Sequence, residues 1–168
     1  MSLKFVKVGT TTPFAEESAI TTSAGAGDAS KIVGTDSGGK IDSTFMPTGF
    51  GSDTSTITAG ENLSAGNLIY LNSSGNALKA DANAQAKEAI GFVLSSISNT
   101  ASGTVYFGSG FITGLTSLTP GARYFLSDTA GAITATPPTG SGKIVQQVGF
   151  ARTSSVLYFE PQPAILLV

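Results

Sequence analysis

The sequence contains no cysteine and no histidine, and these two absences restrict its chemistry more than any other feature. Without cysteine, the chain can form no disulfide, no thiolate nucleophile and no cysteine-based zinc site. Without histidine, it lacks the commonest general base and metal ligand, so a serine–histidine triad cannot be assembled, even between identical subunits. We therefore expect a non-enzymatic protein with no catalytic residue, no cofactor and no bound metal.

Charged residues are also scarce. They make up 12% of the chain, against roughly a quarter in ordinary globular domains, and the net charge is −2. The nine lysines and arginines are scattered, so no basic patch for nucleic acid is expected. Paired carboxylates could serve a glycosidase without histidine. The acidic residues lack the aromatic frame of a sugar cleft, and tryptophan is absent.

No apolar run approaches the roughly 18–20 residues needed to span a bilayer, so we expect no membrane association. Residues 3–8 alternate apolar and polar side chains, which predicts a short strand and is unlike the continuous apolar core of a signal peptide. Such a strand is unstable alone and must pair within its own domain or with a neighbouring subunit. We expect synthesis and folding in a cytoplasm.

What the chain does contain is a repeat. A first copy runs from Leu63 to Phe107 and a second from Leu118 to Phe159, with starting points 55 positions apart. Each opens with a Leu-x-x-Gly step and an apolar run, and continues through a small polar turn. Each then reaches an apolar-Gly-Phe triplet, Ile90–Phe92 or Val148–Phe150, and ends on an aromatic strand. Four landmarks in the same order indicate a tandem duplication.

Each copy is predicted to be a small antiparallel unit of three or four strands. The apolar runs are short, contain β-branched and aromatic residues, and are bounded by glycine, serine, asparagine and threonine. Pro120-Gly121 is the usual central pair of a type II turn. We expect the recurring aromatic residues to form the core. The fold class is therefore all-β, an antiparallel β-sandwich or barrel built from two tandem similar units.

The first 60 residues differ in composition. They are rich in glycine, serine and threonine, with only isolated apolar residues, so they cannot offset a backbone ordering cost of roughly 1–2 kcal/mol per residue. We expect residues 1–60 to form an extended arm and residues 61–168 a duplicated β module. Within the module we place a first unit at 61–115, a second at 116–160 and an apolar C-terminal segment at 161–168. The loop at 79–89 is rich in helix formers and could make a short helix.

Two stretches carry a resemblance to a known class of protein. Gly27–Pro47 (GDASKIVGTDSGGKIDSTFMP) resembles a connector segment of tailed-bacteriophage virion proteins, particularly head-decoration, head-fibre and tail-fibre polypeptides. The block from Glu61–Leu71 (ENLSAGNLIYL) through Leu118–Leu126 (LTPGARYFL) is similar to a β module of the same class. The resemblance implies a trimeric, non-enzymatic, particle-bound protein. A capsid decoration (cement) or head-fibre protein would contact the major capsid protein and reside on the capsid surface of the virion.

We expect the interface with neighbouring subunits to involve isolated apolar residues of the arm and the apolar C-terminus, which would be unfavourable to leave in water. The candidates are Phe5, Phe14, Ile32, Val33, Phe45, Met46, Phe50, Ile165, Leu166, Leu167 and Val168. The alternative is a tail-fibre or adhesin domain that binds a host cell-surface glycan. The segment with Asp36 and Asp42 matches no calcium loop, and an ordinary turn is expected there.

Overall fold

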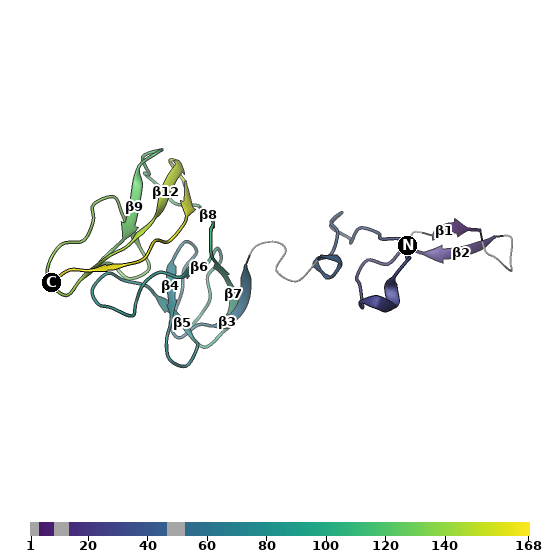
Figure 1. Cartoon of the computed structure of the whole chain (residues 1–168), viewed down its shortest axis with the longest axis horizontal. Coiled ribbons are helices and arrows are strands. Elements are labelled where there is room, and N and C mark those ends of the chain that lie inside the picture. The colour runs from purple at the N-terminus through teal and green to yellow at the C-terminus, as the bar shows by residue number, and fades with distance from the viewer. Residues whose placement is uncertain (1–3, 9–13, 47–52) are drawn as a thin grey trace. The chain divides into compact units, whose positions relative to one another are not determined.

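The computed structural model describes residues 4–8, 14–46 and 53–168. The chain divides into two compact units, Met1–Gly51 and Ser52–Val168. Figure 1 shows the β-rich second unit, which we call the module, with its first half in blue to teal and its second half in green to yellow. Among the described residues, no helix is long and apolar enough to cross a bilayer.

The N-terminal unit consists of short elements. Strands β1 (Lys4–Lys7) and β2 (Ala15–Ser18) pair antiparallel, so the strand expected at residues 3–8 finds its partner in its own chain. Cross-strand ion pairs, Lys4 with Glu16 and Lys7 with Glu17, lie at its surface. Two single 3₁₀ turns follow, η1 (Ala26–Asp28) and η2 (Ser43–Phe45). None of the described residues between 4 and 46 is buried, so this unit has no core of its own.

The module contains two five-stranded antiparallel sheets, which confirms the all-β fold class. The strands of the first sheet are β3 (Thr54–Thr58), β4 (Leu68–Leu71), β5 (Ala77–Lys79), β6 (Gly91–Phe92) and β7 (Ser102–Phe107). Those of the second are β8 (Gly110–Thr113), β9 (Arg123–Leu126), β10 (Ile133–Thr134), β12 (Gln147–Thr153) and β13 (Val156–Phe159). A separate small ladder joins β11 (Ile144–Val145) to β14 (Ile165–Leu166).

The two large sheets have the same strand order. The first runs β3-β7-β6-β4-β5, and the second, listed from its other edge, runs β8-β13-β12-β9-β10. The equivalent strands are therefore β3 and β8, β4 and β9, β5 and β10, β6 and β12, and β7 and β13. β11 belongs to neither of the two large sheets. Each sheet has two edge strands, so neither closes into a barrel, and the architecture is sandwich-like. The tandem duplication stays a prediction, which this shared order supports.

The Leu-x-x-Gly steps form the same turn in both halves. Gly66 has a φ of 85° and Gly121 a φ of 80°. The backbone N–H of Asn67 donates to the carbonyl of Ser64, and that of Ala122 donates to the carbonyl of Thr119, each at 3.0 Å. A positive φ at the third residue and a bond between the first and fourth are typical of the type II turn that the sequence predicts.

The apolar-Gly-Phe triplets place a glycine where two strands approach closely. A Cβ atom at Gly91 would lie 2.6 Å from the carbonyl oxygen of Tyr106, and one at Gly149 would lie 1.9 Å from that of Tyr158. The two tyrosines occupy equivalent positions on β7 and β13, one residue before the partner of each glycine. The glycines of both triplets are therefore required by the same backbone contact.

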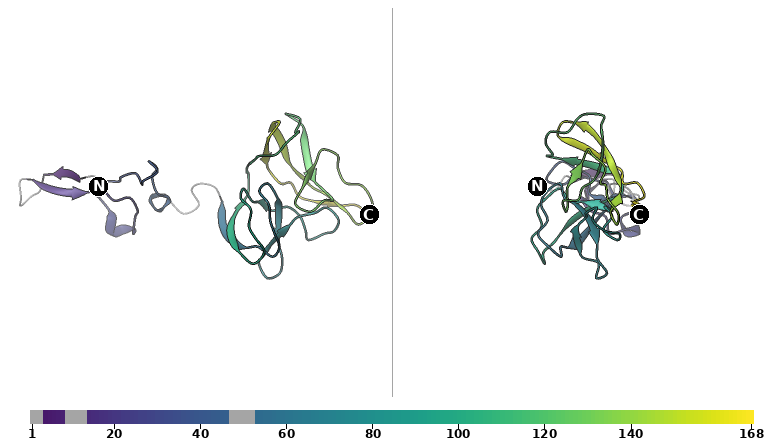
Figure 2. Two further views of the ribbon diagram at one scale, coloured as in Figure 1. Left: turned by 180° about the vertical axis from the view of Figure 1, so that it is seen from behind. Right: turned by 90° about the vertical axis from the view of Figure 1, so that its left-hand side faces the viewer.

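The main core lies between the two sheets. The first sheet contributes Leu68 and Phe92, and the second contributes Leu126, Leu157 and Phe159, all at most 2% exposed. The rings of Phe92 and Phe159 meet edge to face, with centroids 5.3 Å apart. This contact joins the two sheets into one module. Figure 2 shows the halves lying against each other from behind and from the side.

A smaller core covers the opposite face of the first sheet. It contains Ile69, Val93 and Val105 from the sheet, with Leu63 and Ile97 packed over them. Leu63 and Ile97 are held together by two backbone hydrogen bonds, of 2.9 and 3.0 Å. The first sheet is therefore covered on both faces, by loops on one side and by the second sheet on the other.

Three details differ from expectation. Each sheet has five strands instead of three or four, because β3 and β8 precede the repeats recognised in the sequence. β3 pairs with β7, so the first sheet begins before residue 61, and β8 belongs to the second sheet although it lies within 61–115. Residues 80–90 form turns and no helix. There the backbone of Ala80 and Ala82 bonds to Gly131 and Ser127, which ties the loop to the second half.

We predict that Gly149→Ala destabilises the module by about 3 kcal/mol, since it combines backbone strain with a clash against the Tyr158 carbonyl. Gly140→Ala is the matched control, because Gly140 also has a positive φ, 109°, but a Cβ there would meet no atom within 4 Å. Thermal or urea unfolding of both variants measures the difference. Equal losses would show that the close approach of the strands is not limiting.

Candidate functional site

The predicted interface residues of the N-terminal unit lie mostly at its surface. Phe14 is 73% exposed, and Ile32, Val33 and Met46 are also exposed. Phe5, on β1, and Phe45, in η2, are half-buried. Phe50 lies outside the described residues. Three apolar residues that the prediction did not include, Val6, Val8 and Ile41, are each more than half exposed.

The aspartates of the connector organise turns. The Asp36 carboxylate accepts hydrogen bonds from the backbone N–H groups of Gly38 and Lys40, at 2.8 and 2.9 Å. Asp42 caps η2, and the hydrogen bond from the Thr44 hydroxyl, with a second from the Thr44 backbone, lowers the pKa of Asp42. This is the turn chemistry expected there. No group of three or more acidic residues is placed to hold a metal within the part of the chain that the structure describes.

The C-terminal segment is hydrogen-bonded to the module at its start and exposed to solvent at its end. Gln146 is 4% exposed, and its amide both donates to the Ala89 carbonyl, at 3.0 Å, and accepts from the Ala89 N–H, at 2.8 Å. It also donates to the carbonyl of Gln162, at 3.2 Å. Beyond this tie, β14 pairs only with β11 in the described structure.

The predicted C-terminal interface residues therefore remain largely in solvent. Ile165 and Leu166 are 66% and 39% exposed, Leu167 is half-buried and Val168 is fully exposed. Ala164 packs against the module's main core, whereas Ile165, Leu166 and Val168 are exposed.

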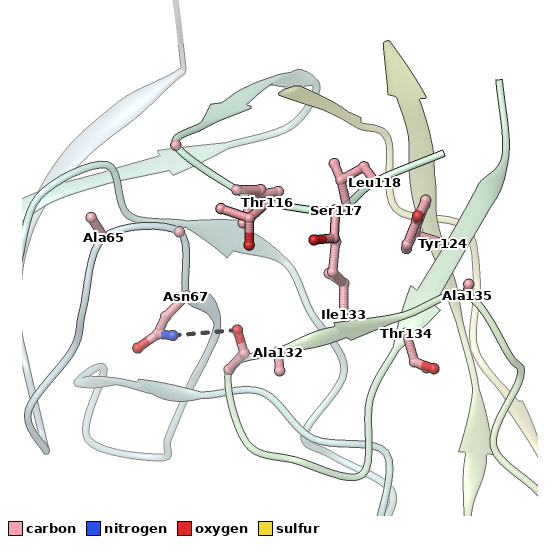
Figure 3. A pocket seen from close by; sticks show the side chains of 14 residues that line it. Ala65, Asn67, Thr116, Ser117, Leu118, Tyr124, Ala132, Ile133, Thr134 and Ala135 are labelled. Atoms are coloured by element: carbon pink, nitrogen blue, oxygen red, sulfur yellow. Dashed lines mark hydrogen bonds between the residues drawn. The ribbon is translucent and has the colours of Figure 1, made fainter. Parts of the chain in front are cut away.

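A hollow with a volume of about 420 Å³ lies where the halves of the module meet. Figure 3 shows it between the first turn, around Asn67, the linker at 114–118 and the start of β10. The Asn67 amide donates to the Gly131 carbonyl, at 3.4 Å, and its oxygen accepts from the Ser64 N–H, at 2.9 Å. The lining of the hollow contains no charged residue, and the Asn67 amide within it is engaged by the backbone.

An aromatic surface that the sequence did not indicate lies on the outer face of the second sheet. The strand register aligns Arg123, Phe150, Tyr158 and Phe111 across β9, β12, β13 and β8. Phe111 and Phe150 are 44% and 41% exposed, and Tyr158 is half-buried between them. Arg152 lies over the Phe111 ring, 5.1 Å from its centroid. We call these five residues the aromatic row.

The aromatic row corrects the expectation that all recurring aromatic residues are core. Phe92 and Phe150 occupy equivalent positions, but Phe92 is buried between the sheets and Phe150 faces solvent. The reason is that the two sheets contribute opposite faces to the shared core. Arg123 stands where the first copy has Leu68, and this exchange is the sequence signal for an outer face.

The ionisable groups whose pKa values shift are stabilised in their charged forms. The hydrogen bond with Lys31 lowers the pKa of Asp28, and the same bond raises the pKa of Lys31. The hydrogen bond to Asp81 raises the pKa of Lys87, at an Nζ–Oδ2 distance of 3.0 Å. All three groups belong to local ion pairs that hold turns.

The sequence gives no match to the models of known protein families or to the curated proteins.

We predict that Gln146→Leu destabilises the module by about 2–3 kcal/mol, because it leaves buried backbone groups of Ala89 without partners. Gln85→Leu is the control, because Gln85 is exposed and lies in the same loop as Ala89. It should change the unfolding free energy by less than about 0.5 kcal/mol. Urea denaturation compares them. A cost at Gln146 no larger than at Gln85 would refute the role of this amide.

Proposed function

We propose that this chain is a non-enzymatic structural protein of a phage virion, which decorates or stabilises the capsid as a trimeric cement or head-fibre protein. In this role the N-terminal unit engages the major capsid protein and neighbouring subunits, and the module projects from the particle. The resemblance of Gly27–Pro47 and of the β module to virion proteins is the source of the proposal.

One structural observation supports it most strongly. The N-terminal unit has no buried residue among those described, yet Val6, Val8 and Phe14 are each more than 70% exposed. A folded protein gains roughly 1.5–3 kcal/mol by burying each large apolar side chain. A unit without a core, with such residues at its surface, gains its stability when another polypeptide covers them.

The module supplies the complementary property. Its two sheets share a core of large, fully buried side chains, so it does not depend on the N-terminal unit for burial. A module with its own core, joined to a unit that docks on other polypeptides, suits a protein that is added to a particle. Synthesis in the host cytoplasm and residence on the capsid surface belong to the same proposal.

The alternative is a tail-fibre or adhesin domain that binds a host glycan. The exposed aromatic row is the feature that favours it, since aromatic rings stack on sugars. A glycan array separates the two proposals: a cement protein gives no binding, whereas an adhesin binds and loses binding when Phe150 or Phe111 is replaced.

The capsid proposal is tested in the full chain with the double variant Phe14→Ser, Met46→Ser, which removes two exposed apolar side chains of the N-terminal unit. Co-sedimentation with capsid shells that lack this protein should show an affinity reduced by at least about 100-fold, if burial of each side chain contributes about 1.5 kcal/mol or more.

Ile90→Ser is the matched control, because Ile90 is an exposed apolar residue of the module, and its affinity for shells should not change. Removal of residues 1–51 should likewise abolish binding while the module keeps its melting temperature. Undiminished binding by the double variant and by the truncated chain would refute the role of the N-terminal unit.

A further inference from the structure

The aromatic row lies on the outer face of the second sheet. The equivalent face of the first sheet lies inside the module. The register makes Phe92 and Tyr106 of the first sheet equivalent to Phe150 and Tyr158 of the second, because each pair flanks its glycine in the same way. In the first sheet these rings stack, with centroids 5.3 Å apart, and the second sheet covers them. In the second sheet nothing in the chain's described module covers the same two positions.

This difference follows from how the sheets pack. The second sheet presents Tyr124, Leu126 and Phe159 to the shared core, and the equivalents of these residues in the first sheet, among them Ile69 and Phe107, face the smaller core. The sheets are therefore stacked face to back. Such a head-to-tail stack leaves one back face free at its end.

The free back face keeps an apolar character. It retains both aromatic residues of the equivalent pair and gains Phe111 where β3 has Thr54 opposite Tyr106. Together with Arg152, the three rings line a shallow depression of about 320 Å³. Neighbouring exposed aromatic residues in one row are more than the scattered apolar residues that any surface carries.

The geometry of the rings favours a protein surface over a sugar as the occupant. The Phe111 and Phe150 rings are tilted against the Tyr158 ring by 51° and 52°, with centroids 5.3 Å away. Rings tilted in this way form ridges that interdigitate with side chains, not a flat platform. The depression is lined by three rings and one guanidinium, so it offers sugar hydroxyls the Arg152 donors and the Tyr158 hydroxyl but no carboxylate or amide.

Charges are placed at opposite ends of this face. Arg152 follows Phe150 on β12, at a bulge between Ala151 and Thr153, and lies near the start of β13. Glu160 follows directly after β13, two residues beyond Tyr158, and continued alternation of the extended chain puts it on the same face. Neither Arg152 nor Glu160 forms an ion pair with another described residue of the module.

We propose that the aromatic row is the contact through which two copies of this chain pair, with Arg152 of each copy against Glu160 of the other. Along the strands, Arg152 lies at one end of the rings and Glu160 at the other, so the face is complementary to itself when the second copy is turned end for end. Arg123, a second cation, lies beside the rings on β9. The first sheet already shows that this face packs against a unit of the same strand order. In that packing, the covering surface is the inner face of the second sheet. The equivalent face of the first sheet is covered by Leu63 and Ile97, so it is not open to a second copy, and the row of one copy meets the row of another.

A contact that is complementary to itself joins two copies, so this inference goes beyond the trimer of the proposed function and adds a twofold contact to it. Analytical ultracentrifugation of the full chain at up to about 100 μM should give a mass that is an even multiple of 16.9 kDa. Phe150→Ser should weaken self-association at least tenfold. Ile90→Ser, which replaces a residue that is equally exposed at 41%, should leave it unchanged.

Charge reversal gives the sharper test. Arg152→Glu alone and Glu160→Arg alone should each weaken self-association, and the double variant should restore it to within about threefold of the original, because the opposite charges again face each other. Melting curves establish that each variant is folded. A chain that is monomeric or trimeric throughout, or a double variant weaker than both single variants, would overturn the proposal.

Sugar binding is the competing outcome. A monomeric chain that binds a glycan and loses it on Phe150→Ser would assign the row to a carbohydrate and overturn self-association through it. A chain that does not pair through the row but still co-sediments with capsid shells would overturn this inference and leave the proposed function standing. A chain that associates through the row but binds no shells would do the reverse.

Discussion

The module depends on the contact between the back of its first sheet and the front of its second. Phe92 lies at the centre of this contact, stacked on Tyr106 within its own sheet and edge to face with Phe159 of the other. Burial of one phenylalanine side chain contributes roughly 1.5–3 kcal/mol, against roughly 0.5–1.5 kcal/mol for a typical hydrogen bond. Because the contact joins unlike faces, it determines which side of each sheet must be apolar, and it leaves the two ends of the stack in different environments.

The two ends of the stack differ in what covers them. At the first, Leu63 and Ile97 cover the sheet with a loop and form a second small core. At the other, Leu118, the equivalent of Leu63, is drawn into the shared core instead, and the aromatic row faces outward. The same alternation of residues along the strands thus gives a face covered by a loop at one end of the stack and a solvent-exposed face at the other. The replacement of Leu68 by Arg123 in the second copy follows from that difference in exposure.

The sequence predicted the fold class and the turns because these depend on local chemistry. Gly66 and Gly121 appear at the third position of matching turns, and their positive φ values are the ones a type II turn requires. It could not predict which face of each sheet is inside, because Phe92 and Phe150 have the same neighbours in sequence and differ only in what packs on them. Propensity also misled at residues 80–90, where tertiary hydrogen bonds from Ala80 and Ala82 replace the helix that the composition allows.

The interface prediction is subject to the same limit. Isolated apolar residues in a glycine-rich segment predict a docking unit, because no local structure can bury them, and Phe14 is exposed in the structure. The aromatic row gives no such signal, since its residues stand in regular strands that look like core. Only the register of four strands, Arg123 to Phe150 to Tyr158 to Phe111, places them side by side on the surface. Surfaces formed by long-range pairing therefore require the structure, whereas surfaces formed by segments without a core can be inferred from composition alone.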